Sequence, residues 1–251
     1  MTDTHAHLDQ IEPPVEALSG AEHFRAVLCP GTEVHSSRAA LSWAERHLQV
    51  YAAVGIHPSE AKGFRPSCAG WVSELVQHPK VRAIGECGLD TYWDDTFFLE
   101  QIAALEFQAE LARSMDLPLI LHVRSREDSK AELELIRLLQ NWGPGRYILH
   151  AFSGNLELAE AALERGGYIS FAGNLTFKKN QRLRQAACLI PRERILLETD
   201  SPYLAPEPYR GKPNRPCYVR ATLNKLAEVL EVDPLALETQ TDTNAEQAFR
   251  W

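Results

Sequence analysis

Short apolar runs alternate with longer amphipathic segments along the whole chain. The runs are rich in Val, Ile, Leu and Ala and lack strict alternation, which is typical of strands covered on both faces. We expect eight strands, at Asp3–Leu8, Ala26–Pro30, Val50–Ile56, Val81–Glu86, Leu117–His122, Tyr147–His150, Gly167–Phe171 and Ile195–Thr199. The segments between the runs have a different periodicity and predict helices.

The clearest helical segment is Asp94–Ser114, where Phe98, Ile102 and Leu105 recur at helical spacing. The other expected helices are Glu33–Leu48, Asp128–Asn141, Leu156–Arg165, Asn180–Cys188, Cys217–Leu230 and Pro234–Arg250. Strands that alternate with helices imply parallel βαβ units. The pattern therefore predicts a parallel sheet with helices on its outside.

Eight such units in 251 residues favour one architecture among the parallel α/β folds. They match the usual size of a (β/α)8 TIM barrel, which is roughly 250 residues. An open doubly wound sheet would need a glycine-rich turn after its first strand, and this chain has His-Ala-His-Leu-Asp-Gln there. We therefore predict a single TIM barrel that occupies residues 1–251 as one domain.

Metal-type side chains stand at the ends of five of the expected strands. In a parallel barrel these ends meet at one face, where TIM-barrel enzymes place their active sites. The first strand ends in two histidines two residues apart, so both imidazoles point to one side. Imidazole and carboxylate groups suit divalent ions such as zinc or manganese, and six ligands exceed the needs of one tetrahedral site. The candidate metal ligands are His5, His7, Glu86, His122, His150 and Asp200.

Composition and charge limit the kinds of function and cellular location that we expect for this protein. The formal net charge of −8 opposes broad, nonspecific adhesion to nucleic acid, although it leaves room for a local basic groove. No apolar run approaches the roughly 20 residues that span a bilayer, so we expect no membrane association. The N-terminal residues do not resemble a secretion signal, and the five scattered cysteines are typical of reduced thiols. We expect a cytoplasmic monomer without an obligate protein partner.

Several blocks of sequence together resemble the TatD family of metal-dependent deoxyribonucleases, within the amidohydrolase-like barrel superfamily. The resemblance runs in order from Asp3 to the C-terminal helices. It implies a TIM barrel of the metallo-dependent hydrolase type that holds two divalent ions per subunit (Zn, Mn, Mg or Co). The blocks that carry it are Asp3-Thr4-His5-Ala6-His7-Leu8, Val54-Gly55-Ile56-His57-Pro58, Gly85-Glu86-Cys87-Gly88-Leu89-Asp90, His150-Ala151-Phe152-Ser153-Gly154 and Glu198-Thr199-Asp200-Ser201-Pro202-Tyr203-Leu204.

The resemblance also implies a division of the ligands. His5, His7, Glu86 and Asp200 would hold one ion, and Glu86, His122 and His150 the other, with Glu86 as the bridge. The implied reaction is phosphodiester hydrolysis from the 3′ end of DNA, with RNA as an alternative substrate. Because it stands beside the attacking water, Asp200 is our candidate general base. Glu86 is the second candidate catalytic residue.

Phosphate needs positive partners outside the metals, and loops at the same face supply candidates. We expect His57 and Arg124 to bind phosphate. Further rim cations are Arg126, Lys178, Lys179, Arg210, Lys212 and Arg215, and the rim aromatics Tyr92, Trp93, Phe177 and Tyr203 are candidates for stacking on bases. Departures from the family pattern at Ser59, Ala151 and Val123–Arg126 touch this rim and bear on substrate preference, without removing a ligand.

Two alternatives stay open at this point. The first keeps the metals and changes the bond, giving a hydrolase of small amides, esters or aminoacyl-tRNA. The second is a metal-stabilised adaptor without catalysis, which predicts that at least one ligand is lost, whereas all six are retained. The sequence therefore favours a nuclease over both.

Overall fold

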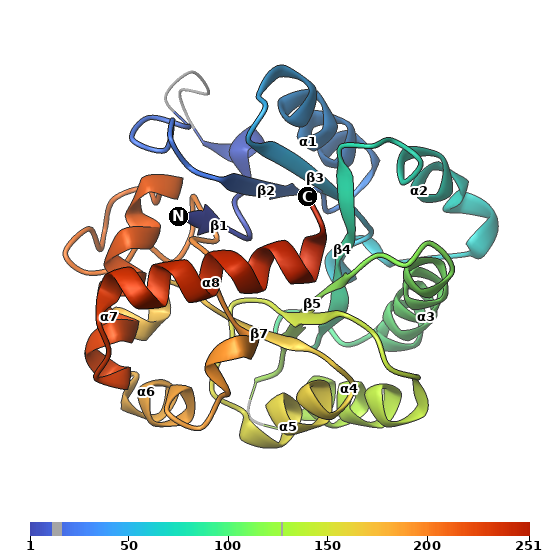
Figure 1. Cartoon of the computed structure of the whole chain (residues 1–251). Coiled ribbons are helices and arrows are strands. Elements are labelled where there is room, and N and C mark those ends of the chain that lie inside the picture. Colours follow the sequence, from blue (N-terminus) through green and yellow to red (C-terminus); the bar gives the residue numbers. More distant parts are fainter. Residues whose placement is uncertain (12–16, 127) are drawn as a thin grey trace.

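A computed structural model describes residues 1–11, 17–126 and 128–251. Eight parallel strands pair with their neighbours in chain order, from β1 to β8. Figure 1 shows them as a ring with helices around its outside, which is the predicted TIM barrel. The strands are β1 (Thr2–Asp3), β2 (Ala26–Pro30), β3 (Val50–Val54), β4 (Val81–Asp90), β5 (Leu119–Arg124), β6 (Tyr147–Leu149), β7 (Tyr168–Phe171) and β8 (Ile195–Leu197).

The first strand is shorter than predicted, because regular pairing ends at Asp3 instead of Leu8. The backbone beyond it bonds to both neighbours in turn. The Thr4 amide donates to the Leu197 carbonyl at 3.0 Å, and the Ala6 amide donates to the Leu28 carbonyl at 2.9 Å. A parallel bridge joins Ala6 to Ser201. These irregular contacts between the first and last segments close the ring.

The fourth strand is longer than predicted and runs on to Asp90, so Glu86 lies within it and not at its end. Three residue steps on β4, from Ile84 to Cys87, match two steps on β5, from Leu119 to Leu121. This irregularity is a β-bulge, which places one extra residue in the strand and turns its side chain in a new direction. The bulge contains Glu86, a predicted metal ligand.

The helices surround the ring (Figure 1): α1 (Val34–Arg46), α2 (Gly70–Leu75), α3 (Phe98–Ser114), α4 (Lys130–Asn141), α5 (Leu156–Glu164), α6 (Gln181–Ala187), α7 (Val219–Leu230) and α8 (Pro234–Phe249). The short α2 was not predicted. Helix α3 begins four residues later than predicted, because the side chain of Asp94 accepts a hydrogen bond from the Thr96 amide at 2.9 Å. Such a local turn competes with the helix. Residues 91–97 therefore form a loop.

The barrel interior is apolar at one end and polar at the other. Side chains of seven strands pack together inside the ring, namely Leu28, Ala53, Ala83, Ile120, Ile148, Tyr168 and Leu196. Ala245, Ala248 and Phe249 of α8 join this cluster, and Figure 1 shows α8 lying across the end of the ring. The helix therefore closes the N-terminal end of the barrel. The polar residues lie at the carboxyl ends of the strands.

The structure also bears on expectations about thiols and membranes. Cys29, Cys68, Cys87, Cys188 and Cys217 are all unpaired. Among the described residues, none of the helices combines the length and the apolar character needed to cross a bilayer.

Candidate metal centre

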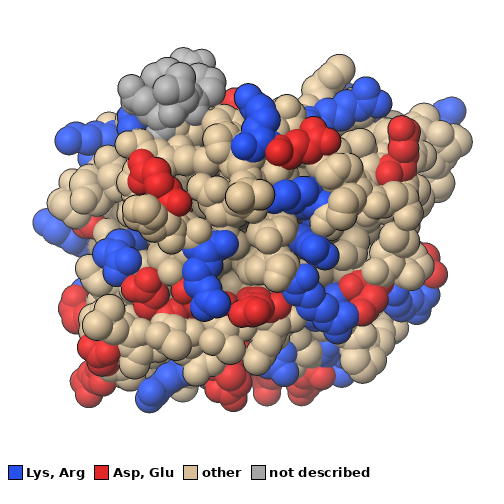
Figure 2. All heavy atoms as spheres, turned by 45° about the horizontal axis from the view of Figure 1, so that its top comes forward, with Lys and Arg blue, Asp and Glu red and all other residues tan. Residues whose placement is uncertain are grey.

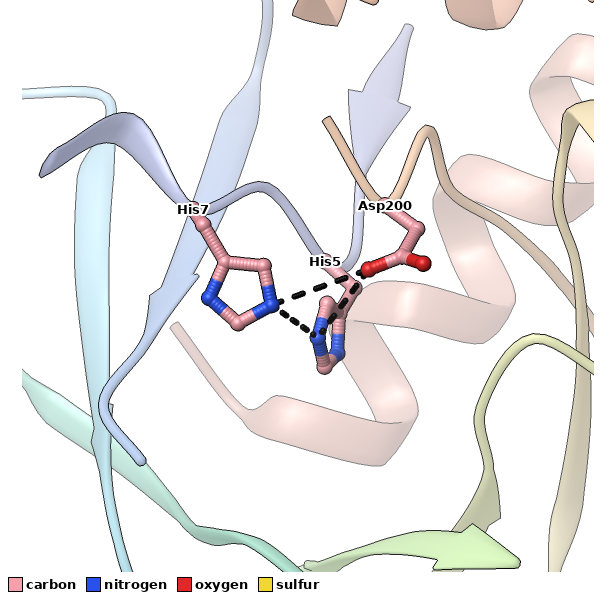
Figure 3. A group of neighbouring side chains, drawn as sticks. All are labelled: His5, His7 and Asp200. Carbon is pink, nitrogen blue, oxygen red and sulfur yellow. Dashed lines mark hydrogen bonds and ion pairs between the residues drawn. The ribbon is translucent and has the colours of Figure 1, made fainter. Parts of the chain in front are cut away.

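Three predicted ligands converge where the first and last strands meet, and we call them the first cluster: His5, His7 and Asp200. Figure 3 shows the two imidazoles and the carboxylate pointing toward one another. The Asp200 Oδ1 atom lies 3.8 Å from His5 Nε2 and 3.6 Å from His7 Nε2. The Asp200 amide donates to the His5 carbonyl at 2.8 Å, so the backbone holds the two segments together. All three potential ligand atoms lie within 4.8 Å of one another.

The arrangement of the two histidines in the first cluster fits a cation. Their Nε2 atoms face each other at 3.3 Å, and their Nδ1 atoms are buried without a hydrogen-bond partner among the described residues. Burial, reinforced by neighbouring His5, lowers the pKa of His7 to about 3, which keeps that imidazole neutral. A neutral imidazole offers a lone pair to a metal. The residues present therefore fit a divalent ion at this position.

The carboxylate of Glu86 lies between two sets of histidines. Its Oε2 atom is 3.4 Å from His5 Nε2 and 3.5 Å from His7 Nε2. Its Oε1 atom is 3.0 Å from both His122 Nδ1 and His150 Nε2. Burial alone would raise the pKa of Glu86, but the histidines around it hold that pKa well below its usual range. The charged carboxylate of Glu86 thus presents one oxygen to His5 and His7 and the other to His122 and His150.

His122 and His150 form the second cluster, and a carboxylate holds the far side of each ring. The Nε2 atom of His122 is 3.0 Å from Asp90 Oδ2, and the Nδ1 atom of His150 is 3.2 Å from Glu198 Oε1. Histidines that bind metals commonly make such a bond with the nitrogen that does not face the ion. Burial works against charge on both rings, yet the neighbouring carboxylates raise the pKa of His122 and of His150.

His57 also approaches Glu86, with 3.6 Å between its Nε2 atom and Glu86 Oε1. The backbone amide of Ser59 donates to His57 Nδ1 at 3.1 Å. Because an amide can only donate, the proton of the neutral ring must sit on Nε2. Burial lowers the pKa of His57 to about 4, so this neutral form persists at physiological pH. In this tautomer His57 points an N–H donor toward Glu86. His57, Glu86 and His122 also lie close enough together to form a possible metal-binding group.

The two clusters open into a cavity of about 920 Å³ at the mouth of the barrel. His57 and Arg124 both line it, as do Trp93 and Tyr203. Among its described lining residues, Arg124 is the one lysine or arginine. The other predicted rim cations are not part of this lining: Arg126, Lys178, Lys179, Arg210, Lys212 and Arg215. Of the rim aromatics, Tyr92 stacks against Arg124, and Phe177 stacks against Arg210.

Sequence reasoning missed Asp90, Glu198 and Asp3. Asp3 is fully buried and accepts hydrogen bonds from the amides of His5 and Thr199 at 3.3 and 2.9 Å. All three carboxylates lie inside the sequence blocks that carry the family resemblance. A signal for them was thus present, although it did not say which group each carboxylate contacts.

The comparisons with known proteins agree with this geometry. The family model described as TatD related DNase matches residues 2–250. The chain is 33% identical to the uncharacterized metal-dependent hydrolase YabD of Bacillus subtilis, over 99% of this chain and 98% of that protein. It is 32% identical to the 3′-5′ ssDNA/RNA exonuclease TatD of Salmonella typhimurium, over 94% and 91% of the two chains.

Among solved structures, the TatD homologue YjjV from Escherichia coli superimposes with a TM-score of 0.87 at 29% identity, over 100% of this chain and 98% of that one. The family model covers both clusters and Glu86, and the two relatives match 99% and 94% of the chain. The chain therefore belongs to the TatD family of metal-dependent hydrolases.

Proposed function

We propose that this protein is a nuclease that binds two divalent ions and hydrolyses phosphodiester bonds at the ends of DNA. The observation that carries the proposal is the position of Glu86, which turns one oxygen toward His5 and His7 and the other toward His122 and His150. A carboxylate can bridge two ions in this way, whereas one nitrogen of a histidine cannot. The ligand division implied by the family resemblance fits this geometry.

In this proposal the first ion is held by His5, His7, Asp200 and Glu86, and the second by Glu86, His122 and His150. Bound divalent ions would lower the pKa of a water molecule and offset the charge that builds up on phosphoryl oxygens. Zn, Mn, Mg and Co are all candidates.

Asp200 is the proposed general base. Burial raises its pKa to about 6 in the protein without metal, against the opposing effect of His150 and His5. A bound cation would lower this pKa, so the base role rests on the position of the carboxylate beside His5 and His7. His57 donates its Nε2–H to the phosphate, and Arg124 supplies a positive charge at the cavity wall.

The substrate assignment rests on the relatives and on the location of charge. Relatives at about 32% identity carry the name 3′-5′ ssDNA/RNA exonuclease, which supports cleavage from the 3′ end with RNA as an alternative substrate. Basic and acidic side chains are interspersed over the face in Figure 2, and the net charge is −8. Such a surface does not favour binding along a strand. In the proposal the strand end is recognised in the cavity at the mouth of the barrel, which His57 and Arg124 line.

The test is hydrolysis by apo-protein that has been loaded in turn with Mg, Mn, Zn and Co. Single-stranded DNA labelled at its 5′ end should shorten stepwise, and DNA labelled at its 3′ end should release a labelled mononucleotide at once. Aminoacyl-tRNA and a small aryl ester serve as competing substrates. Turnover of either competitor with no shortening of DNA under any metal would overturn the proposal. The monomeric state and the cytoplasmic location stay predictions.

A further inference from the structure

The loop after β4 exposes a large aromatic side chain at the mouth of the barrel. Trp93 is 72% exposed to solvent and lines the cavity that contains both histidine clusters. Tryptophan is highly buried on average, so a ring left this open at the edge of a cavity calls for an explanation. Packing in the core does not provide one, because most of the ring surface faces water.

Trp93 is held in place from the side of the protein. Its ring meets that of Tyr92 edge to face, with 4.7 Å between the centroids. The guanidinium of Arg124 lies 3.9 Å from the centroid of Tyr92 and 5.5 Å from that of Trp93. Cations over aromatic rings attract the ring faces. The three side chains form one stack, which we call the Trp93 stack.

Hydrogen bonds anchor the loop beneath this stack. The Tyr92 amide donates to Asp90 Oδ1 at 2.8 Å, and the Thr91 amide donates to the Arg124 carbonyl at 2.8 Å. Arg126 donates to the Tyr92 carbonyl. The exposed ring therefore sits on a fixed support, and its orientation is largely set before anything binds.

A second exposed aromatic stands on the opposite side of the mouth. Tyr203 follows β8, is 54% exposed and lines the same cavity, and its hydroxyl donates to Gln10 Oε1 at 2.7 Å. In a ring with the order β1 to β8, the end of β4 lies half-way round from the end of β8. Glu86 and the two clusters thus lie between Trp93 on one side of the mouth and Tyr203 on the other.

We propose that Trp93 is a stacking platform for an unpaired base within the last three nucleotides of the substrate strand. The inference rests on the proposed nuclease function and adds a residue that selects single-stranded ends. Every base has a π-face that an aromatic side chain can cover, so stacking tolerates any sequence. In a duplex those faces are already covered by neighbouring bases, except for the outer face of the terminal base pair. Arg124 in the same stack brings positive charge next to the backbone phosphates.

The decisive measurement is the affinity of the metal-loaded protein for a single-stranded phosphorothioate oligonucleotide that resists cleavage. Trp93→Ala should bind it about 5- to 150-fold more weakly, the range found for loss of one stacked base. Trp93→Phe keeps a ring and should retain most of the affinity. Leu99→Ala is the matched control, because Leu99 is 78% exposed and lies outside the cavity lining.

Abasic sites, introduced one at a time at the last three positions, identify the stacked base. At one of these positions, removing the base should weaken binding to the wild type. On that abasic strand, Trp93→Ala should bind almost as tightly as the wild type, because both changes remove the same contact. Equal effects of Trp93→Ala on intact and abasic strands at all three positions would overturn the platform.

Cleavage separates this proposal from the proposed function. If the wild type shortens DNA and Trp93→Ala binds the phosphorothioate strand as tightly as the wild type does, the nuclease assignment stands and the platform falls. If the wild type cleaves no oligonucleotide with any metal, the nuclease assignment fails and the platform fails with it. A fully abasic strand should be cleaved equally by the wild type and by Trp93→Ala.

Discussion

The first and second clusters present similar side chains to Glu86, but the protein holds them in different ways. In the second cluster, Asp90 lies within hydrogen-bond distance of His122 Nε2, and Glu198 lies within hydrogen-bond distance of His150 Nδ1. These are the ring nitrogens that face away from Glu86. In the first cluster, the corresponding Nδ1 atoms of His5 and His7 have no hydrogen-bond partner among the described residues. There the backbone is fixed instead, through the buried side chain of Asp3 and the contacts between the two chain segments.

The difference is whether hydrogen bonds fix the histidine rings themselves, as in the second cluster, or only the backbone that carries them, as in the first. A carboxylate behind an imidazole sets both its tautomer and its orientation, so the second cluster is ready for an ion before the ion arrives. The first cluster fixes the backbone and packs the His5 ring against that of His150, with 4.0 Å between the centroids, but no hydrogen bond to Nδ1 sets the tautomer of His5 or His7. We therefore expect the second site to fill at lower metal concentration than the first.

The largest effect is expected from Glu86→Ala, because this change removes the residue that both sites share. Hydrolysis should be abolished, and bound metal should fall below that of either His7→Ala or His122→Ala, each of which damages one site. Elemental analysis of the three purified variants, together with turnover of single-stranded DNA, checks this. A full complement of metal in Glu86→Ala would refute the bridging role.

Asp200→Asn tests the catalytic part of the first cluster. Asparagine keeps the shape and one ligand oxygen but cannot take up a proton at neutral pH. Turnover should fall by a factor on the order of 10²–10⁴, the typical loss on removing a positioned general base, while affinity for an uncleavable strand changes little. Turnover, affinity and metal content are measured on one preparation. Near-normal turnover with full metal content would remove Asp200 from the base role.

Asp90→Asn and Glu198→Gln probe the carboxylates behind the second cluster. Each replacement keeps the shape of the side chain. The amide then presents either an N–H donor or a neutral carbonyl oxygen, which is a weaker acceptor, to the histidine. Metal affinity should drop by roughly 10–100-fold, the usual cost of losing such a partner, and the loss should be confined to one of the two binding steps. Calorimetric titration resolves the steps. An equal loss in both steps would show that the clusters are not held independently.

Asp3→Asn has the smallest expected effect on turnover and tests the backbone support of the first cluster. Burial raises the pKa of Asp3 from 3.8 to about 8, so the folded state binds a proton that the unfolded chain releases above pH 4. Stability from this group is complete below pH 3.8 and is lost as the pH rises toward 8, by up to about 1.4 kcal/mol per pH unit.

Asparagine cannot ionise, and it keeps the oxygen that accepts from the amides of His5 and Thr199. The free energy of unfolding of metal-free Asp3→Asn should therefore fall less than that of the wild type between pH 5 and pH 8. Chemical denaturation at several pH values measures it. Parallel pH profiles for the two proteins would mean that Asp3 is ionised in the folded state.

Much of the fold could be predicted because the apolar pattern reports burial directly. The six strands other than β1 and β4 lie within two residues of their predicted bounds. Strands β1 and β4 deviate most; the predicted ligand Glu86 lies within β4, and the predicted ligands His5 and His7 follow β1. At β4 a bulge adds a residue at Glu86, and after β1 the chain pairs irregularly with both neighbours around Ala6. Such departures depend on pairing across strands, which periodicity within one strand does not encode.

Contacts between strands also limited how much of the candidate site could be predicted from the sequence. The six predicted ligands do converge, because the carboxyl ends of parallel strands must meet at one face. The partners Asp90 and Glu198 lie 32 and 48 positions away from the histidines that they contact. Only the register between strands brings them together. The pattern of the sequence also does not reveal that Arg124 lines the cavity and Arg126 does not.

Helix α8 has a consequence for how a strand would be degraded. Side chains of the strands fill the barrel and α8 covers its far end, so the cavity at the mouth is open on one side and does not continue as a tunnel. In the proposed reaction a nucleotide cut from a chain end leaves on the side by which the strand entered. The strand is therefore not threaded through the barrel as it is shortened.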